Sequence, residues 1–382
     1  MKKIIFLITF FIALSCKENT PIPSDSSTRT SIPIKYAQGF LLHQYPTYKL
    51  LEVTKAFPNS TDTLRYALIP KTLDSLSRTQ LSIAKDIPRI EVPIKTVVVT
   101  STTHIPSLEM LGVGHTLVGF PSLDYVSSSL FRKRIKRNLI KELGSNESIN
   151  TEVLIDLNPA AVVSFGIEGQ NKSLALAEKA GIPILYNGDW VEQDPLGKVE
   201  WVKFFGALYN KNERAQELFT QIEADYLKTK KLVSNIAVKP TVVSGAMYKD
   251  VWHLPKGDSW AARLIEDAGG NYLWSDTEGT GSIALSIESV LDKAQDAEYW
   301  IGPTQFTSYS ALKNSNTAYT HFESFASKKV YTFAARKGKT GGLLYYELGP
   351  NRPDIVLKDM AHYLHPELFP EYNPYFFSPL ED

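Results

Sequence analysis

Few side chains in this 382-residue sequence have the types and spacing of a catalytic or metal site. His362 and His365 lie three residues apart near an expected helix end, which could suit a metal, but no carboxylate or third histidine accompanies them. A polar helix end, where the dipole favours histidine, explains the pair without a metal. The glycine-rich residues 112–119 superficially suggest a dinucleotide loop, yet they follow an expected helix and lead into a strand, the wrong context for that fingerprint. Serine, histidine and aspartate occur, but nothing brings them together as a triad. We therefore expect no enzyme, no cofactor and no resident metal.

The only cysteine, Cys16, has the position of an acylation site. The apolar residues 4–14 follow two lysines and are too short for a comfortable membrane span, so residues 1–15 have the layout of a secretory signal peptide. Ser15 and Cys16 at its end resemble a bacterial lipobox, although Ala13 stands where leucine is usual. We expect Cys16 to be the lipidated first residue of the mature protein. The alternative is an ordinary signal peptide with an incidental cysteine.

Residues 16–31 are rich in serine, threonine and proline, with little to bury, and predict a flexible tether between the lipid and the folded part. The mature chain has no other cysteine and so no disulfide. Residues 32–93 contain short alternating apolar stretches, which are strand and hairpin signals. We predict an antiparallel β-rich extension that packs on the first lobe.

The charge of the chain argues against a nucleic-acid partner. Basic and acidic residues number 41 each, whereas a nucleic-acid-binding protein would favour a basic face. The one basic run, residues 132–137, is typical of a solvated helix face, with a phosphate or lipid patch as the alternative.

Residues 196–236 organise the rest of the sequence. From Glu213 onward, apolar residues recur at helical spacing opposite charged ones, the pattern of an amphipathic helix. Short strand and helix signals alternate before this stretch and begin again after it. We predict one long connecting helix between two lobes.

Both flanking regions have an α/β pattern. In residues 94–195, the β-branched run 96–101 predicts a strand buried on both faces, and an expected helix at 172–180 lies between two strand-like runs. Residues 237–382 repeat the plan. We predict an α/β fold with two Rossmann-like lobes, joined by one long backbone helix and preceded by the β extension.

One sequence pattern occurs once in each lobe. Glu152 and Asp156, four residues apart, precede a strand-like run in the first lobe, and Glu288 and Asp292 do the same in the second. The pattern predicts a short helix followed by a strand in each lobe, and therefore an internal pseudo-symmetry.

From about residue 94, the sequence resembles the class III substrate-binding proteins of ABC importers, which serve iron–siderophore complexes and cobalamin. The order of the segments, together with the lipobox and the connecting helix, carries the resemblance more than any single motif. The segments are residues 96–101 with the following loop, 152–165, the connecting helix, 252–259, 268–271 and 286–288.

The resemblance implies a ligand between the lobes, held by loops at the carboxyl ends of strands. It also implies that an exposed glutamate on each lobe, Glu152 and Glu288, docks on one subunit of a permease dimer. Helix starts favoured by the macrodipole are the simpler explanation of both glutamates. Aromatic side chains would suit a large flat ligand, and arginine a carboxylate or catecholate–iron anion. The implied ligand residues are Thr102, Thr103, His104, Phe165, Gly166, Asp189, Trp190, Tyr248, Trp252, Trp260, Tyr309 and Arg336.

The expected function is that of a monomeric binding lipoprotein in the periplasm or cell envelope, anchored to a membrane by lipid. It would capture an iron–siderophore-type complex and deliver it to an ABC importer permease. Cobalamin or haem is the alternative ligand, because the same scaffold serves all three. An envelope enzyme or chelatase on the same fold is a further alternative, which turnover of a substrate would favour over stoichiometric capture.

Overall fold

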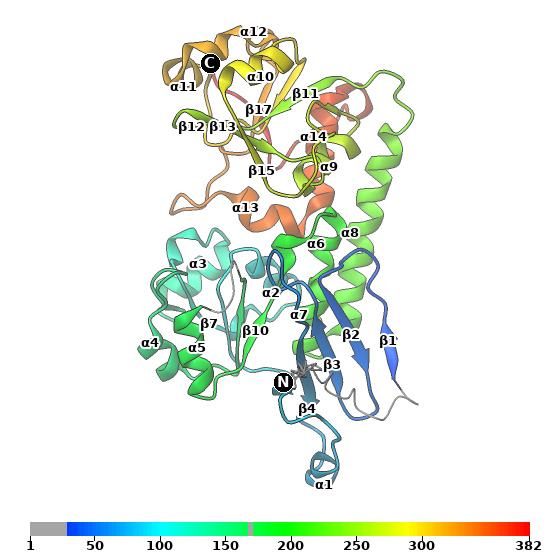
Figure 1. The fold of residues 1–382 in the computed structure, drawn as a ribbon, viewed down its shortest axis with the longest axis vertical. Coiled ribbons are helices and arrows are strands. Elements are labelled where there is room, and N and C mark those ends of the chain that lie inside the picture. Colours follow the sequence, from blue (N-terminus) through cyan, green and yellow to red (C-terminus); the bar gives the residue numbers. More distant parts are fainter. Residues whose placement is uncertain (1–28, 167–170) are drawn as a thin grey trace, which may run out of the picture.

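The computed structural model of the chain describes residues 29–166 and 171–382. Two α/β lobes lie one above the other, and the helix α8 (Asn212–Val233) runs along one side of them (Figure 1). The expected signal peptide, Cys16 and nearly all of the tether lie outside the described residues. Within the described ranges, no helix is long and apolar enough to cross a membrane.

The N-terminal lobe contains a parallel five-stranded sheet with the strand order β10-β9-β6-β7-β8. Its central strands β6 (Val97–Val99) and β9 (Ala161–Ser164) are entirely buried, as expected of β-branched strands in a parallel sheet. The other elements are α2 (His104–Met110), β7 (Leu117–Phe120), α3 (Ser129–Lys136), β8 (Lys141–Glu142), α4 (Thr151–Leu157), α5 (Lys172–Lys179) and β10 (Ile184–Tyr186).

The C-terminal lobe repeats this plan with the order β14-β11-β16-β17-β18, in which only β18 is antiparallel. A separate antiparallel sheet, β12-β13-β15, belongs to the same lobe. The predicted two-lobed α/β architecture is therefore confirmed. The elements are β11 (Thr241–Ser244), β12 (Ala246–Tyr248), β13 (Val251–Pro255), α9 (Trp260–Asp267), β14 (Asn271–Tyr272), β15 (Ser282–Leu285), α10 (Ile287–Ala294), β16 (Tyr299–Ile301), α11 (Tyr309–Ser315), α12 (Glu323–Ala326), β17 (Val330–Thr332), α13 (Leu344–Leu348), α14 (Pro353–Leu364) and β18 (Ser378–Pro379).

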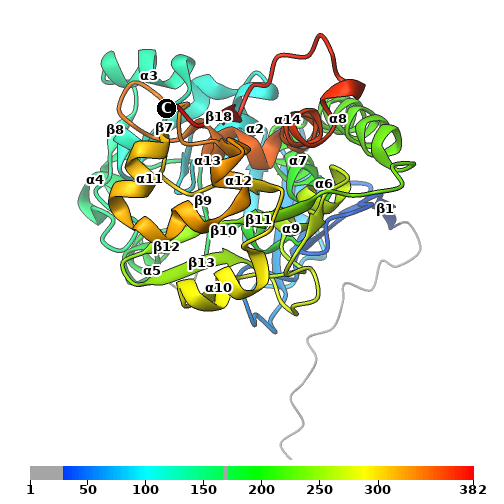
Figure 2. The ribbon, with the colours of Figure 1, turned by 90° about the horizontal axis from the view of Figure 1, so that it is seen from above.

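The long backbone helix is confirmed as α8, which packs along α14 (Figure 2). The first part of the predicted stretch 196–236 instead forms two short helices, α6 (Pro195–Glu200) and α7 (Val202–Leu208). Every residue of both is buried, whereas α8 has one buried face. Asn210, which has a left-handed backbone (φ 54°), separates α7 from α8. The break between these helices was missed because a helix that is buried on all sides has no amphipathic pattern to mark its ends.

The predicted β extension is a five-stranded sheet in the order β1-β2-β3-β4-β5. Its first four strands are antiparallel, but β4 and β5 are parallel, which the sequence did not predict. The crossover between them contains α1 (Ser75–Thr79) and covers a small second core on the outer face of the sheet. The inner face joins the main core of the molecule. The strands are β1 (Thr30–Ile32), β2 (Phe40–Gln44), β3 (Lys49–Val53), β4 (Leu64–Pro70) and β5 (Arg89–Val92).

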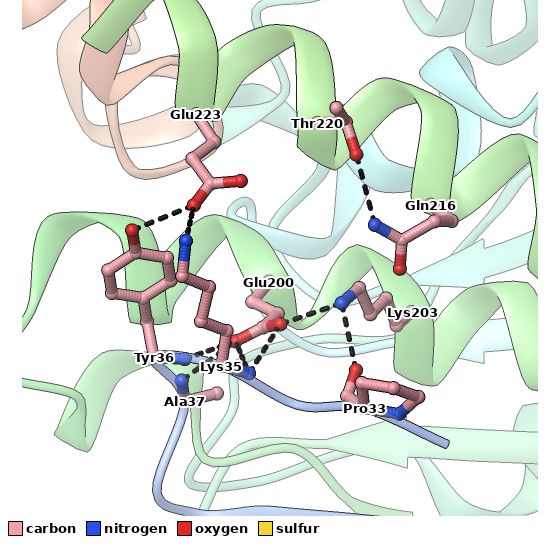
Figure 3. A network of polar contacts seen from close by, with 9 residues as sticks. All are labelled: Pro33, Lys35, Tyr36, Ala37, Glu200, Lys203, Gln216, Thr220 and Glu223. Carbon is pink, nitrogen blue, oxygen red and sulfur yellow. Dashed lines mark hydrogen bonds and ion pairs between the residues drawn. The ribbon is translucent and has the colours of Figure 1, made fainter. Parts of the chain in front are cut away.

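A buried carboxylate fixes the start of this extension to the connecting helices (Figure 3). Glu200, on α6, has no exposed side-chain surface. Its two oxygens accept the backbone N–H groups of Lys35 (2.9 Å), Tyr36 (2.7 Å) and Ala37 (2.9 Å). Lys203 Nζ, also buried, lies 2.7 Å from Glu200 Oε1. One side chain thus satisfies three backbone donors and a buried cation, which is how a charge is tolerated in a protein interior.

Two further contacts surround this carboxylate. Lys203 Nζ also donates to the carbonyl oxygen of Pro33 at 3.0 Å. Glu223, on α8, accepts the hydroxyl of Tyr36 at 2.7 Å and pairs with Lys35 (Figure 3). The extension is therefore held both by apolar packing and by side chains of α6, α7 and α8.

Candidate functional site

A cavity of about 420 Å³ lies between the two lobes. On the N-terminal side, it is bounded by residues that follow the carboxyl ends of β6, β7 and β9, where open parallel sheets usually bind ligands. On the C-terminal side, it is bounded by α13 and the loop before it. The lining residues are Thr100, Ser101, Thr102, Phe120, Pro121, Tyr125, Asn146, Phe165, Gly341, Gly342, Leu343 and Tyr346.

The loop before α13, residues 337–343, forms a strap from the C-terminal lobe to the N-terminal lobe. It is a tight hairpin in which Gly338 N–H donates to Gly342 C=O at 2.7 Å. Thr340 Oγ1 donates to the carbonyl oxygen of Asp124 at 2.6 Å. A Cβ atom on Gly342 would lie only 2.7 Å from the carbonyl oxygen of Tyr125. Glycine is therefore required for the strap to approach the N-terminal lobe this closely.

The chemistry of the cavity is aromatic and hydroxyl-rich. Tyr125 and Tyr346 come from opposite lobes and are 66% and 53% exposed, so part of each ring can contact a ligand, although the Tyr346 ring also packs edge-on against Phe333 and Tyr345. Thr100, which follows β6, contacts the end of β9: its Oγ1 donates to Ser164 Oγ (3.2 Å) and accepts the Phe165 N–H (3.2 Å). The cavity therefore suits a ligand with a broad apolar or aromatic surface and a few polar groups.

Two of the predicted ligand residues, Thr102 and Phe165, line this cavity together. Both follow strands that the sequence identified, β6 and β9. The structure therefore places them where the resemblance implied, while their role in binding remains a prediction.

Five predicted ligand residues are buried and do not line this cavity, which corrects their assignment: His104, Gly166, Asp189, Trp252 and Tyr309. Trp252 is fully buried and stacks on Trp300, with ring centroids 5.2 Å apart. It alternates inward on β13, so it belongs to the core of the C-terminal lobe. Tyr309 is 6% exposed, with Lys328 above its ring. His104 has no exposed surface and packs against the ring of Phe205.

Five other predicted residues, Thr103 among them, keep some exposed surface but do not line the cavity that contains Thr102. Trp190 donates its indole N–H to the carbonyl oxygen of Gly166 at 3.1 Å. Tyr248 is 65% exposed on β12. Trp260 is stacked on Tyr345, with ring centroids 5.8 Å apart. Arg336 lies over the ring of Tyr375, next to the strap.

Glu152 and Glu288 occupy matching places in the two lobes. Glu152 is exposed in the first turn of α4, whose N-cap is Asn150. Glu288 is exposed in the first turn of α10, whose N-cap is Ser286. Its own backbone N–H and the Ser286 hydroxyl lower the pKa of Glu288. Each helix leads into a central strand of its lobe, β9 or β16, and the two helices lie on different lobes (Figure 1).

Sequence reasoning missed the strap and Tyr346. The available signal was local: Gly341-Gly342 marks a turn, and the aromatic pair Tyr345-Tyr346 follows it. One tyrosine of the pair is buried and the other is exposed toward the cavity. Which of the two faces the cavity depends on how α13 packs, and this information is absent from the local sequence.

Comparisons with known proteins agree with this architecture. A family profile described as "Periplasmic binding protein" matches residues 97–336. An uncharacterised lipoprotein of Methanocaldococcus jannaschii is 30% identical over 300 residues, which cover 75% of this chain and 69% of that protein. A second uncharacterised lipoprotein of the same organism is 23% identical over 291 residues, covering 73% and 72%.

Solved structures share the fold at low sequence identity. A periplasmic heme-binding protein from Pseudomonas aeruginosa is 14% identical, covers 76% of this chain and 99% of its own, and has a TM-score of 0.56. A structure described as an ABC-type Fe3+-hydroxamate transport system from Saccharomonospora viridis is also 14% identical, covers 72% and 94%, and has a TM-score of 0.53. At these identities the likeness shows the fold alone.

Proposed function

This chain belongs to the periplasmic binding protein family, and on that premise we propose that it is the substrate-binding lipoprotein of an ABC importer. It captures an iron–siderophore-type complex between its lobes and delivers it to the permease. The observation that carries the proposal is the interlobe cavity of about 420 Å³, built from strand-end loops of one lobe and the strap and α13 of the other. A binding protein needs such a site, because both lobes then contact one ligand.

The aromatic lining also favours a second candidate, a flat macrocycle such as haem or a corrinoid. Phe120, Tyr125, Phe165 and Tyr346 all line the cavity. The two lysines of the strap, Lys337 and Lys339, are exposed a few residues before the lining residues Gly341 and Gly342, and positive charge there suits an anionic iron complex. Structural relatives of both kinds exist, a heme-binding protein and an Fe3+-hydroxamate transport protein.

Absorbance and mass of the material that co-purifies with the chain test the proposal and separate its ligands. Haem and cobalamin each have strong visible spectra of their own, and ferric siderophores are identified by mass and iron content. One bound molecule per chain, released unchanged, supports capture. Conversion of a candidate substrate into product would support an envelope enzyme or chelatase instead.

Replacing Tyr346 with alanine is expected to weaken ligand binding by about 10-fold. A ring that stacks on a ligand typically contributes about 1 kcal/mol, and about 1.4 kcal/mol corresponds to a tenfold change in affinity. Because the side chain is 53% exposed, the free energy of unfolding should change little. Quenching of tryptophan fluorescence during titration measures the affinity. Tyr299→Ala is the control, because Tyr299 is the first residue of the central strand β16 and does not line the cavity. Equal losses in both variants would remove Tyr346 from the site.

The lipid anchor has its own test. Cys16→Ala should release the protein from the membrane into the soluble fraction of the envelope and abolish labelling with a radioactive fatty acid, because no thiol remains to be acylated. Fractionation followed by immunoblotting measures the distribution. A variant that stays in the membrane pellet without acyl label would contradict Cys16 as the anchor.

A further inference from the structure

One glutamate of the C-terminal lobe caps a helix of the N-terminal lobe. Glu347, on α13, is only 4% exposed. Its carboxylate accepts the backbone N–H groups of Ser127 (2.5 Å) and Ser128 (2.8 Å). Ser128 is the N-cap of α3, but its own side chain makes no capping hydrogen bond. The N–H of Ser128, one of the four open donors at the start of α3, and the N–H of Ser127 before it are thus satisfied from the other lobe.

The lobes also touch on either side of this carboxylate. Ser127 Oγ donates to the strap at Gly342 C=O, at 3.1 Å. A Cβ atom on Gly338 would lie 2.8 Å from Ser127, so the strap fits closely there. On the other side, the buried Asn351 accepts Ser107 Oγ (2.9 Å) and donates to Thr103 C=O (2.7 Å). Separating the lobes therefore breaks the Glu347 contacts and exposes its carboxylate to water.

Few charges compensate the buried carboxylate. A second interlobe cavity, of about 330 Å³, adjoins Glu347. Among the residues that line this cavity, only Glu109, Glu347 and Tyr375 have ionisable side chains. Glu109, on α2, accepts Ser128 Oγ at 2.7 Å. Arg336 lies over the ring of Tyr375. The charged residues of the neighbouring segments are Asp124 before α3, Arg132, Lys133, Arg134 and Lys136 on α3, and Lys337 and Lys339 on the strap.

Burial and, to a smaller extent, the charge of Glu109 raise the pKa of Glu347 to about 7, even though the two backbone N–H groups lower it. In an arrangement that exposed the carboxylate, its pKa would return toward the ordinary 4.5. A carboxyl group with a raised pKa favours the arrangement that buries it while it is protonated. That contribution is complete below about pH 4.5, where the exposed group would also be protonated, and it is lost as the pH rises through about 7.

We propose that Glu347 is a proton-linked latch between the lobes: closing the lobes takes up a proton at this side chain, and opening them releases it. The latch does not depend on which ligand occupies the cleft, so its failure would leave the proposed transport function intact. It makes the ease of opening a function of pH, and opening removes the acceptor of two backbone N–H groups at the start of α3.

The distance between two spin labels, one on each lobe, tests the latch. Cys16→Ser leaves no other thiol in the full-length chain, so Ser148→Cys and Lys313→Cys, both at exposed positions, can be labelled selectively. The ratio of closed to open molecules should fall about 30-fold between about pH 5.5 and about pH 8.5, as linkage requires for this pKa difference. The measurement is made without ligand in purified protein.

Three variants make the result specific. Glu347→Gln keeps the size of the side chain but cannot ionise, so the ratio of closed to open molecules should no longer depend on pH. Glu347→Ala removes the acceptor, so more molecules should be open at both. Glu109→Gln, beside the latch, should keep the pH dependence with a lower midpoint, because its charge raises the pKa of Glu347. A wild-type distance that is unchanged with pH, or a Glu347→Gln variant with the wild-type pH dependence, would overturn the proposal.

Discussion

Replacing Glu200 with alanine is expected to lower the free energy of unfolding by about 3–5 kcal/mol, the cost of removing one partner from a buried ion pair. The variant would leave the ammonium group of Lys203 buried without its carboxylate, together with three backbone N–H groups at residues 35–37. Unpaired buried donors cost far more than the net stabilisation of an ordinary hydrogen bond. Urea unfolding followed by circular dichroism measures the loss.

The control lies in the same network. Glu223→Ala removes the partner of Tyr36 OH and of the Lys35 side chain, but the Lys35 side chain is 60% exposed. That change should cost about 0–1 kcal/mol, as for other ion pairs at the surface. Hydrogen exchange should also show the first residues of the extension losing protection in Glu200→Ala and not in Glu223→Ala. Equal and small effects of both variants would mean that apolar packing alone holds the extension.

The central strands of the N-terminal lobe were predictable because their signal is continuous and local. Val97–Val99 and Ala161–Ser164 are β-branched or small throughout, and a strand covered on both faces has no polar position to interrupt the run. The pairing of β4 with β5 was not predictable in the same way. A parallel pair depends on where the crossover, residues 71–88, returns, and that is a property of the assembled fold.

The site was harder to predict because burial of an aromatic side chain is decided by strand direction and packing. Trp252 and Tyr248 lie on the paired strands β13 and β12, yet the tryptophan is in the core and the tyrosine is exposed. A hydrophobic side chain in a strand-like run has the same local sequence in either case. The opposite problem arises with charged residues. Glu200 and Glu347 would be expected at the surface from the sequence, but contacts with distant segments bury both.

The double variant Glu152→Ala with Glu288→Ala is expected to lose most of its transport activity while ligand capture is unchanged. The two glutamates are exposed on separate lobes, at the starts of α4 and α10, where a two-fold permease could contact both at once. Loss of one interface charge typically weakens association by about 10-fold, and two independent sites should combine to about 100-fold. Association with the permease in detergent and uptake by whole cells measure the effect.

Glu213→Ala provides the matched control, because Glu213 is also an exposed glutamate in the first turn of a helix, α8, but outside the repeated pattern. Glu152 and Glu288 could act only on the dipoles of their own helices. In that case Glu152→Ala, Glu288→Ala and Glu213→Ala should each lose about 0.3–1 kcal/mol of stability, and permease association should not change. If they dock, only Glu152→Ala and Glu288→Ala should weaken permease association, with a smaller dependence on salt. Uptake equal to wild type in the double variant would leave them as ordinary helix-start residues. Loss of ligand affinity in that variant would instead place the ligand near α4 and α10, away from the cavity between Thr102 and Tyr346.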